Sequence, residues 1–306
     1  MTSKVSNAKK KVPALPLKLR LTRIGFSLYG AIAPRQAGRK AEKMFRVTTR
    51  RPRPLDEQAI VLNATPLTLD FEGLTLAGYE WRPTTDELGL PPVLLMHGWD
   101  SRASQLAPIV KALLSVGHRV IAFDAPGHGD SPARDATVST FSDLVLEIDR
   151  RFGPFHAALG HSVGGAAVTL AVTRGLRTKR LITLAAPASL RRASLRVAAM
   201  LGLSPRVTDA MLQAAAISNG RALDDLESTG LSLPADVSAL LLHDPRDRQV
   251  PISESAIVAA AWPNASLHHI AGVGHNGILA ADSVHRLLLE FIAPPVRAQA
   301  DLALAS

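Results

Sequence analysis

The sequence contains no cysteine, and aromatic residues make up only 4% of its 306 residues. The absence of cysteine excludes disulfide bonds, cysteine nucleophiles and thiolate metal sites together. Long apolar runs are also missing: the uncharged stretch 24–34 has 11 residues, whereas roughly 18–20 are needed to span a bilayer. With 47% hydrophobic and 20% charged residues the chain can bury a full core, so we expect a soluble protein with one large domain or two small ones.

Acidic residues are scarce at the N-terminus. Residues 1–55 contain 15 Lys and Arg and a single acidic residue, Glu42, which gives a net charge of +14. The remaining residues contain 20 Lys and Arg against 25 Asp and Glu, a net charge of −5. The overall charge of +9 therefore belongs to a basic N-terminal segment, 1–55, and we interpret residues 56–306 as a separate main domain.

The basic segment has apolar residues at helical spacing. They are Leu21, Ile24, Leu28 and Ile32. This period predicts an amphipathic helix over about residues 17–33, and a second short helix is expected over 35–45. The sequence Arg-Arg-Pro-Arg-Pro at 50–54 then predicts an extended linker, because proline lacks an amide hydrogen and disfavours helix in the residue before it.

Two interpretations of the amphipathic helix stay open. Basic residues interleaved with Leu and Ile suit an anionic membrane surface, whereas a nucleic-acid site would be expected to have more aromatic residues than Phe26, Tyr29 and Phe45. Alternatively, the helix packs on the main domain and its charges face solvent. The segment fits a signal peptide poorly, because charges interrupt its leucines and Pro34 would follow the cleavage site. We expect a cytoplasmic or membrane-peripheral protein with no nucleic-acid partner.

The main domain alternates between short apolar runs and helix-length segments. Its first part predicts a β-hairpin with strands 67–71 and 74–81. Six further strands are expected at 93–96, 120–123, 157–159, 181–184, 239–242 and 267–270. Helices are expected near 102–116, 139–151, 164–174, 253–261 and 280–292. This pattern is typical of an α/β fold with a mostly parallel, twisted sheet that carries helices on both faces.

One stretch interrupts this alternation. Between residues 184 and 239 the sequence has helical spacing and no strand, so residues 188–235 are expected to form a small helical lid insertion rather than an ordinary crossover. Its apolar composition favours an acyl or aromatic substrate. Arg191, Arg192 and Arg196 leave room for an anionic one.

The most specific motif is Gly160-His-Ser162-Val-Gly164, which follows an apolar run and precedes a helix-length segment. This is the G-x-S-x-G pattern in a strand–turn–helix setting, where a sharp turn exposes the serine hydroxyl. Small neighbours let the strand and the helix approach, and the start of the helix directs free N–H groups at developing negative charge. The alternative is a glycine-rich turn with an incidental serine.

Chain order supplies an independent test of this motif. A nucleophilic serine needs a base and an acid, which in this setting follow in the order Ser, Asp or Glu, His. Asp244 and Asp247 come just after a predicted strand, and His275 lies on a Gly-flanked loop after the last strand. Active sites of open parallel sheets gather at such positions.

Residues 66–292 resemble the α/β-hydrolase superfamily. The matching segments are Met96-His-Gly-Trp99, Asp124-Ala-Pro-Gly-His-Gly-Asp-Ser131, the Ser162 turn, His243-Asp-Pro-Arg-Asp-Arg-Gln-Val-Pro251 and Gly272-Val-Gly-His275. The resemblance implies Ser162 as the nucleophile, His275 as the general base and then acid, and Asp247 as the carboxylate that orients His275. Asp244 is the alternative for this last role.

The resemblance also implies an oxyanion hole. In this superfamily it uses the backbone N–H of the residue after the nucleophile, here Val163, and one from the loop after an early strand, here Trp99. A serine at residue 162 disfavours dehalogenase-like and epoxide-hydrolase-like activities, whose members carry aspartate there. The resemblance implies a serine hydrolase, centred on carboxylesterases, that acts on a small-molecule acyl substrate.

Other functions stay open: an acyltransferase with the same three residues, and a hydrolase-like binding protein without catalysis. A cofactor-free haloperoxidase-like or carbon–carbon bond hydrolase activity is also compatible with these residues. No nucleotide-binding motif follows a strand, and the adjacent His268 and His269 lack partners at metal-ligand spacing, so we expect neither cofactor nor metal. His97 and His128 are interpreted as orienting residues, and His161 is expected to point away from the reaction. Asp124 is expected to fix its own glycine-rich loop.

Overall fold

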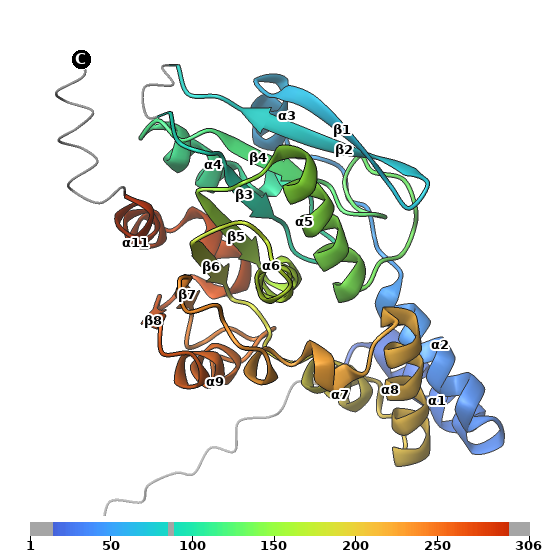
Figure 1. The fold of residues 1–306 in the computed structure, drawn as a ribbon. Helices are drawn as coiled ribbons and strands as arrows, with labels where there is room; N and C mark the ends of the chain where they lie inside the picture. The colour runs from blue at the N-terminus through green and yellow to red at the C-terminus, as the bar shows by residue number, and fades with distance from the viewer. Residues whose placement is uncertain (1–14, 85–88, 294–306) are drawn as a thin grey trace, which may run out of the picture.

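The computed structural model describes residues 15–84 and 89–293. Within them an eight-stranded sheet has the order β1-β2-β4-β3-β5-β6-β7-β8 (Figure 1). The strands are β1 (Thr65–Phe71), β2 (Leu74–Trp81), β3 (Val93–Met96), β4 (Val120–Phe123), β5 (Ala157–His161), β6 (Arg180–Leu184), β7 (Ser238–His243) and β8 (Ala265–His269). β2 is antiparallel to both β1 and β4, and all other neighbours are parallel. The predicted hairpin and all six predicted strands are confirmed to within two residues.

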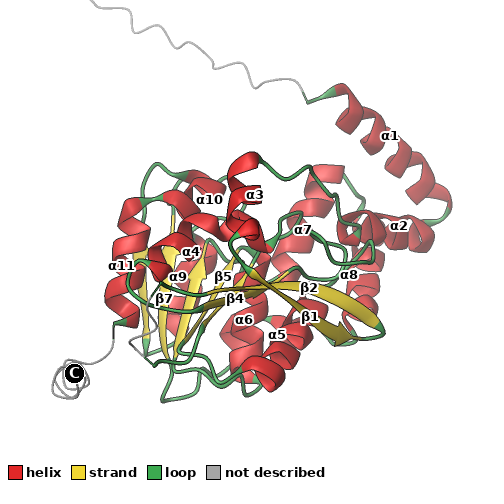
Figure 2. Ribbon diagram, turned by 90° about the horizontal axis from the view of Figure 1, so that it is seen from above, coloured by secondary structure: helices red, strands yellow, loops and turns green. Residues whose placement is uncertain are grey.

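The middle of the sheet is buried on both faces, which explains its continuous apolar runs. In β3, Leu94 and Met96 contribute to one core cluster, and Val93 and Leu95 contribute to the other. The first cluster includes residues of α5 (Val138–Phe152), α6 (Val163–Thr173) and α9 (Ser253–Ala261). The second includes residues of α3 (Leu55–Leu62), α4 (Ala107–Leu114) and α11 (Asp282–Ile292). The two sets of helices therefore cover opposite faces (Figure 2).

The helix boundaries differ from the sequence expectation in a few places. The helix expected near 102–116 divides into a 3-10 turn, Ala103–Leu106, and α4. α3 and the single-turn helix α10 (Gly274–Gly277) were not predicted. α3 lies between the basic segment and the hairpin. Its one buried apolar residue is Ile60, so the helix shows little apolar periodicity in the sequence.

A second helical layer lies beside the sheet domain. The predicted insertion forms α7 (Leu190–Leu201) and α8 (Pro205–Asn219), which end at Gly202 and Gly220 in the left-handed conformation. The basic segment forms α1 (Leu17–Ile32) and α2 (Pro34–Arg46), which confirms both predicted helices. The four helices share a small core of Phe26, Ala37, Ala41, Ala198, Leu201, Val207 and Met211. Figure 1 shows α2 alongside α8, with α1 on the outside.

The contact between α2 and α8 is close and partly polar. A Cβ on Gly38 would lie 2.5 Å from the Cβ of Ala210, so only glycine permits this approach. The buried Glu42 carboxylate accepts hydrogen bonds from Ser218 Oγ at 2.6 Å and from Arg46 Nε at 3.0 Å. The single acidic residue of the basic segment is thus a structural contact to the insertion.

α1 packs on the insertion through a face other than its predicted apolar stripe. The buried residue of α1 is Phe26. The predicted stripe is exposed to solvent, at Leu21, Ile24, Leu28 and Ile32. A helix can pack through one bulky aromatic side chain and leave its other apolar face free, which periodicity does not reveal.

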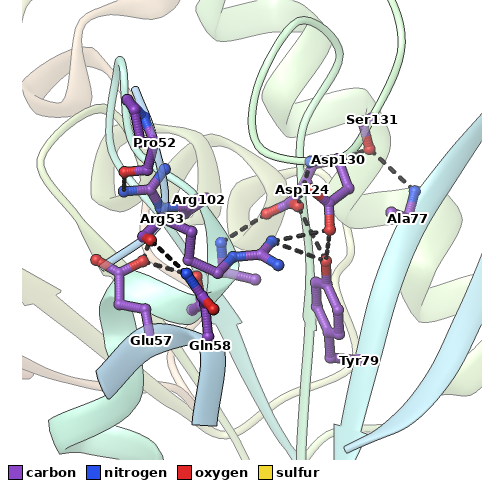
Figure 3. A network of polar contacts seen from close by, with 12 residues as sticks. Pro52, Arg53, Glu57, Gln58, Ala77, Tyr79, Arg102, Asp124, Asp130 and Ser131 are labelled. Atoms are coloured by element: carbon purple, nitrogen blue, oxygen red, sulfur yellow. Dashed lines mark hydrogen bonds and ion pairs between the residues drawn. The ribbon is translucent and has the colours of Figure 1, made fainter. Parts of the chain in front are cut away.

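The predicted linker is extended but held on the main domain. Thr48 N donates to Arg134 O at 2.9 Å, and Arg53 contacts Asp130 at 2.8 Å and the Tyr79 hydroxyl at 3.3 Å. Figure 3 shows Arg53 directed at Tyr79 and Asp130. Arg102 donates to the carbonyls of Arg51 and Pro52, and its Nε lies 2.7 Å from Glu57. The division of the chain at residue 55 stays a prediction, and contacts cross it; residues 1–14 lie outside the described part of the chain.

Candidate active site

Ser162 occupies a sharp turn between β5 and α6. Its backbone has φ 53° and ψ −125°, a strained conformation for a residue with a side chain. The neighbouring glycines make the turn possible, because a Cβ on Gly164 would lie 2.3 Å from the carbonyl oxygen of His97. Gly98 also comes close, since a Cβ there would lie 3.1 Å from Ser162 Cβ. The serine is therefore presented at the carboxyl edge of the sheet, against the loop that follows β3.

His275 lies between Ser162 and Asp247. Its Nε2 is 3.0 Å from Ser162 Oγ, and its Nδ1 is 2.7 Å from Asp247 Oδ2. A carboxylate can only accept, so Nδ1 carries the proton and Nε2 is free to accept from the serine hydroxyl. Three residues far apart in the sequence thus form one hydrogen-bonded chain, in the order anticipated from the motifs.

Asp247 is held in its ionised form. Burial opposes ionisation, but the nearby His243 ring and hydrogen bonds from His275 and the amides of Val250 and Gln249 outweigh it and hold the pKa of Asp247 well below its usual range. The two amide nitrogens lie 3.0 and 2.7 Å from Oδ1. His243 Nε2 is 3.6 Å from Oδ2 and also donates to Val250 O at 2.9 Å. The negative charge beside His275 is therefore permanent at neutral pH.

Asp244 does not contact His275 through its side chain. Its Oδ1 accepts from Arg246 N at 2.8 Å and its Oδ2 accepts from Gly274 N at 2.6 Å. These amides lower the pKa of Asp244 and fasten the loop on which His275 lies. The geometry favours Asp247 over Asp244 as the partner of His275, and gives Asp244 a supporting position.

His161 has a role that the sequence reasoning missed. Its Nε2 lies 2.9 Å from the backbone carbonyl of His275, and the two rings are 4.9 Å apart. Burial, with repulsion from His275, lowers the pKa of His161 to about 4, so the ring is neutral and Nε2 carries the proton. The only sequence signal for this contact is that His161 precedes Ser162, because the position of the His275 carbonyl depends on the fold.

Val163 and Trp99, the predicted oxyanion donors, each adjoin a residue close to the serine turn. Val163 is the first residue of α6, so its N–H has no acceptor within the helix. Trp99 follows Gly98, and its ring stacks on Phe45 at 6.2 Å and on Phe141 at 6.0 Å. Their role in an oxyanion hole stays a prediction.

Two buried polar residues fix the loops around the serine. His97 Nδ1 donates to Gly98 O at 2.7 Å, and its Nε2 accepts from Ala125 N at 3.0 Å, which joins the loops after β3 and β4. Burial keeps the pKa of His97 well below its usual value, so it stays neutral. Asp124 accepts from the amides of Ala103 at 2.7 Å and Asp130 at 2.8 Å (Figure 3). These contacts fit the orienting and loop-fixing positions expected for His97 and Asp124.

A narrow, mainly apolar cavity of about 60 Å³ adjoins Trp99 and Val163. Its lining comes from the sheet domain, from the insertion and from the basic segment. α7 contributes Leu190, Ala193 and Ser194, α8 contributes Met211, Ala215 and Asn219, and α2 contributes Glu42, Phe45 and Arg46. The helical insertion therefore borders this cavity, and α2 contributes to the lining, which was not anticipated; that the insertion covers Ser162 stays a prediction.

The lid arginines are used in ion pairs. Arg192 and Arg196 contact the buried Glu254 of α9 at 3.1 and 2.8 Å, and Arg191 contacts Asp224 at 2.8 Å. Arg192 and Arg196 fasten the lid to α9 of the sheet domain, whereas the pair of Arg191 and Asp224 lies within the insertion. These ion pairs occupy the arginines in this state, and an anionic substrate stays an untested expectation.

Neither a metal-binding group nor a membrane span is found in residues 15–84 and 89–293. No cluster of three or more His, Asp or Glu in these ranges could hold a metal ion. None of the helices there is long and apolar enough to cross a bilayer.

A family model described as "Alpha/beta hydrolase family" matches residues 93–287, well over half of the chain. The chain belongs to the α/β-hydrolase family. This hydrolase is 36% identical over 95 residues to a putative carbamate hydrolase RutD of Variovorax paradoxus (29% of this chain, 36% of that one). It is 35% identical over 109 residues to a non-heme chloroperoxidase of Streptomyces lividans (34% and 37%), and 34% identical over 97 residues to an sn-1-specific diacylglycerol lipase ABHD11 of Xenopus laevis (30% and 31%). These matches span about a third of the relatives' length.

Solved structures agree on the fold of this hydrolase. Est1E of Butyrivibrio proteoclasticus, with ferulic acid bound, is 21% identical with a TM-score of 0.59 over 74% of this chain and 100% of that one. Mouse α/β-hydrolase domain-containing protein 10 is 21% identical with a TM-score of 0.58 over 75% of this chain and 97% of that one.

Proposed function

We propose that this α/β-hydrolase is a serine esterase-like enzyme, which cleaves a carboxylic ester, thioester or amide through an acyl-enzyme on Ser162. The observation that carries the proposal is the chain Ser162 Oγ–His275 Nε2–His275 Nδ1–Asp247 Oδ2, with distances of 3.0 and 2.7 Å on the strained serine turn. Strain of this kind costs free energy and persists where a function depends on the geometry.

The contacts support a two-step acyl transfer. Ser162 Oγ attacks the carbonyl carbon as its proton passes to His275 Nε2, and the ionised Asp247 stabilises the resulting imidazolium. The tetrahedral intermediate collapses when the same proton moves from Nε2 to the leaving alcohol, thiol or amine. Water then repeats the sequence on the acyl-enzyme, releases the carboxylic acid and restores Ser162.

The negative charge on the carbonyl oxygen needs donors during both steps. We assign the backbone N–H groups of Val163 and Trp99 to this task, because the first opens a helix and the second lies in the loop adjoining Ser162. The positive end of α6 adds to the stabilisation. Removal of one such donor generally reduces kcat by about 10²–10³-fold.

The acyl part of the substrate is expected to be apolar. The cavity beside Trp99 and Val163 is lined mainly by alkyl and aromatic groups, and its small volume in this state requires the lid helices to part for a long chain. Relatives described as a diacylglycerol lipase and as an esterase with ferulic acid bound support a lipid-like or aromatic acyl group, without choosing between them.

Fluorophosphonate labelling tests the nucleophile, and p-nitrophenyl esters of increasing chain length test the reaction. We expect labelling and turnover by the wild type and neither by Ser162→Ala. A wild-type protein that is folded yet neither labels nor hydrolyses any ester would contradict the proposal and favour a binding protein. An acyltransferase with the same residues is distinguished by product analysis, since it would transfer the acyl group to an added alcohol or amine in preference to water.

A further inference from the structure

The outer face of α1 carries a continuous apolar stripe. It consists of Leu17, Leu21, Ile24, Leu28 and Ile32, which are 68%, 60%, 57%, 66% and 86% exposed. Isolated exposed apolar side chains are ordinary, but five in line on one helix are not. Figure 2 shows α1 at the outer edge of the molecule, away from the sheet.

The stripe lies opposite the face through which α1 is packed. With 3.6 residues per turn, the five side chains fall within an arc of about 80°, and Phe26 projects from the other side of the helix. Phe26 is 6% exposed and enters the core shared with α7 and α8. Gly30 permits the close approach, since a Cβ there would lie 2.6 Å from a methyl of Val207. The folded protein therefore holds the stripe outward.

Basic side chains border the stripe. Lys18 and Arg20 lie on its two sides according to the helical period, and both are exposed. On α2, the exposed Arg35, Arg39 and Lys43 line a groove with residues of α8, and Lys40 lies over the ring of Tyr29 at 5.9 Å. None of these six residues forms an ion pair with any residue in the described ranges, and Glu42, the acidic residue of this segment, is buried against α8. Lys18 and Arg20 thus place positive charge on both sides of the exposed apolar face.

We propose that α1 is an interfacial anchor that docks the enzyme on an anionic lipid bilayer, with its stripe at the boundary between headgroups and acyl chains. An apolar face bordered by Lys and Arg is the pattern of helices that lie in the plane of a membrane. A helix of 16 residues is about 24 Å long, which suits this orientation. A second copy of the chain fits less well, because two such faces would bring like charges together.

The anchor is independent of the catalytic proposal, but it is part of the layer that covers the cavity. Met211 belongs to the core that α1 packs into, and it also lines the cavity beside Trp99. Docking through α1 would therefore hold the lid helices α7 and α8 close to the lipid surface.

Vesicle co-sedimentation of the full chain tests the anchor with matched variants. The probe is vesicles of phosphatidylcholine with phosphatidylglycerol, compared with phosphatidylcholine alone. Leu21→Asp/Leu28→Asp removes two stripe residues seven positions apart. The control, Leu55→Asp/Leu62→Asp, changes two leucines with the same spacing on α3, which are 80% and 85% exposed. All four side chains are on the surface, so circular dichroism and melting temperature are expected to change little.

We expect the wild type and the α3 variant to bind anionic vesicles equally, and the α1 variant to partition at least about tenfold less. Lys18→Glu/Arg20→Glu is expected to weaken binding to anionic vesicles while leaving the weaker binding to neutral ones unchanged. The four lysines in residues 1–14 are present in every variant, so attraction through them alone would leave all variants alike. Equal binding by all variants would overturn the proposal, and so would a wild type that does not bind vesicles. A wild-type dimer that the α1 variant disperses, without vesicle binding, would assign the stripe to a second copy of the chain instead.

Discussion

His161 Nε2 donates a hydrogen bond to the backbone carbonyl of His275 across 2.9 Å. The residue before the proposed nucleophile thus positions the main chain of the proposed base. His275 is held from three directions, because Asp247 contacts its ring and Asp244 anchors the amide of the preceding Gly274. These contacts fix the imidazole relative to Ser162 before any substrate arrives.

Loss of the His161 contact is expected to reduce kcat more than it changes KM. We expect His161→Leu to lower kcat by about ten- to hundredfold, because a displacement of His275 by a fraction of an ångström misaligns it with Ser162. His161→Gln, whose amide can donate to the same carbonyl, is expected to keep most of the activity. Steady-state kinetics on a p-nitrophenyl ester measures both. Equal losses in the two variants would contradict a role for the donated hydrogen bond.

His161 also makes the folded state sensitive to acid. Its pKa is lowered from 6.5 to about 4, so between these values the unfolded chain binds a proton that the folded chain does not. Above pH 6.5 the ring is neutral in both states and does not lower the free energy of unfolding. As the pH falls from 6.5 toward 4, the free energy of unfolding declines by about 3 kcal/mol through this group. Urea unfolding at pH 7 and pH 4.5 measures it. His161→Gln should show a clearly smaller decline than the wild type; an identical decline would assign the acid sensitivity to other groups.

Substitutions of Asp247 and Asp244 are expected to have different effects on catalysis. Asp247→Asn should reduce kcat by about 10³–10⁴-fold, because the amide no longer favours the useful tautomer of His275. It should also lower stability at neutral pH, because the folded protein favours the ionised carboxylate. Asp244→Asn keeps one acceptor and loses the other, so we expect about 1–2 kcal/mol lower stability and a much smaller fall in kcat. Kinetics and thermal unfolding on both variants separate these effects. A larger catalytic loss in Asp244→Asn would exchange the two assignments.

The cavity predicts how acyl-chain preference can be changed. Ala193 of α7 lines the cavity, whereas Leu195 on the same helix is 42% exposed. We expect Ala193→Phe to fill the cavity and shift the preferred p-nitrophenyl ester to shorter chains, at least about tenfold in relative kcat/KM, with Leu195→Phe as the unchanged control. If both variants keep the wild-type preference, the acyl chain binds elsewhere.

Much of the main domain could be predicted because its signals are local. Strands such as β3 and β7 are short apolar runs between turns, and the turn at Ser162 needs glycines that are visible in the sequence. Motif order indicated Ser162, His275 and one of Asp244 and Asp247, and the resemblance to the superfamily favoured Asp247. Choosing Asp247 over Asp244 on physical grounds needed the fold, since both residues end the same strand and only contacts separate them.

The helical layer was harder to predict, because its contacts join segments remote in the sequence. Glu42 of α2 meets Ser218 of α8, and α2 lines the cavity through Phe45. Nothing local to residues 34–46 indicates this partner. The same holds for the lid arginines. In the sequence Arg192 and Arg196 have no evident partner, and only the fold places Glu254 of α9 within ion-pair distance of both.

The sequence by itself determined the serine nucleophile motif, the alternating sheet and helices, and an amphipathic α1 with positive charge. Each depends on residues close together in the chain, where period and spacing carry the information. Only the tertiary structure decided which face of α1 is buried. Phe26 fills the core between α7 and α8, and since a helix cannot bury two opposite faces in one contact, its leucine and isoleucine stripe faces outward.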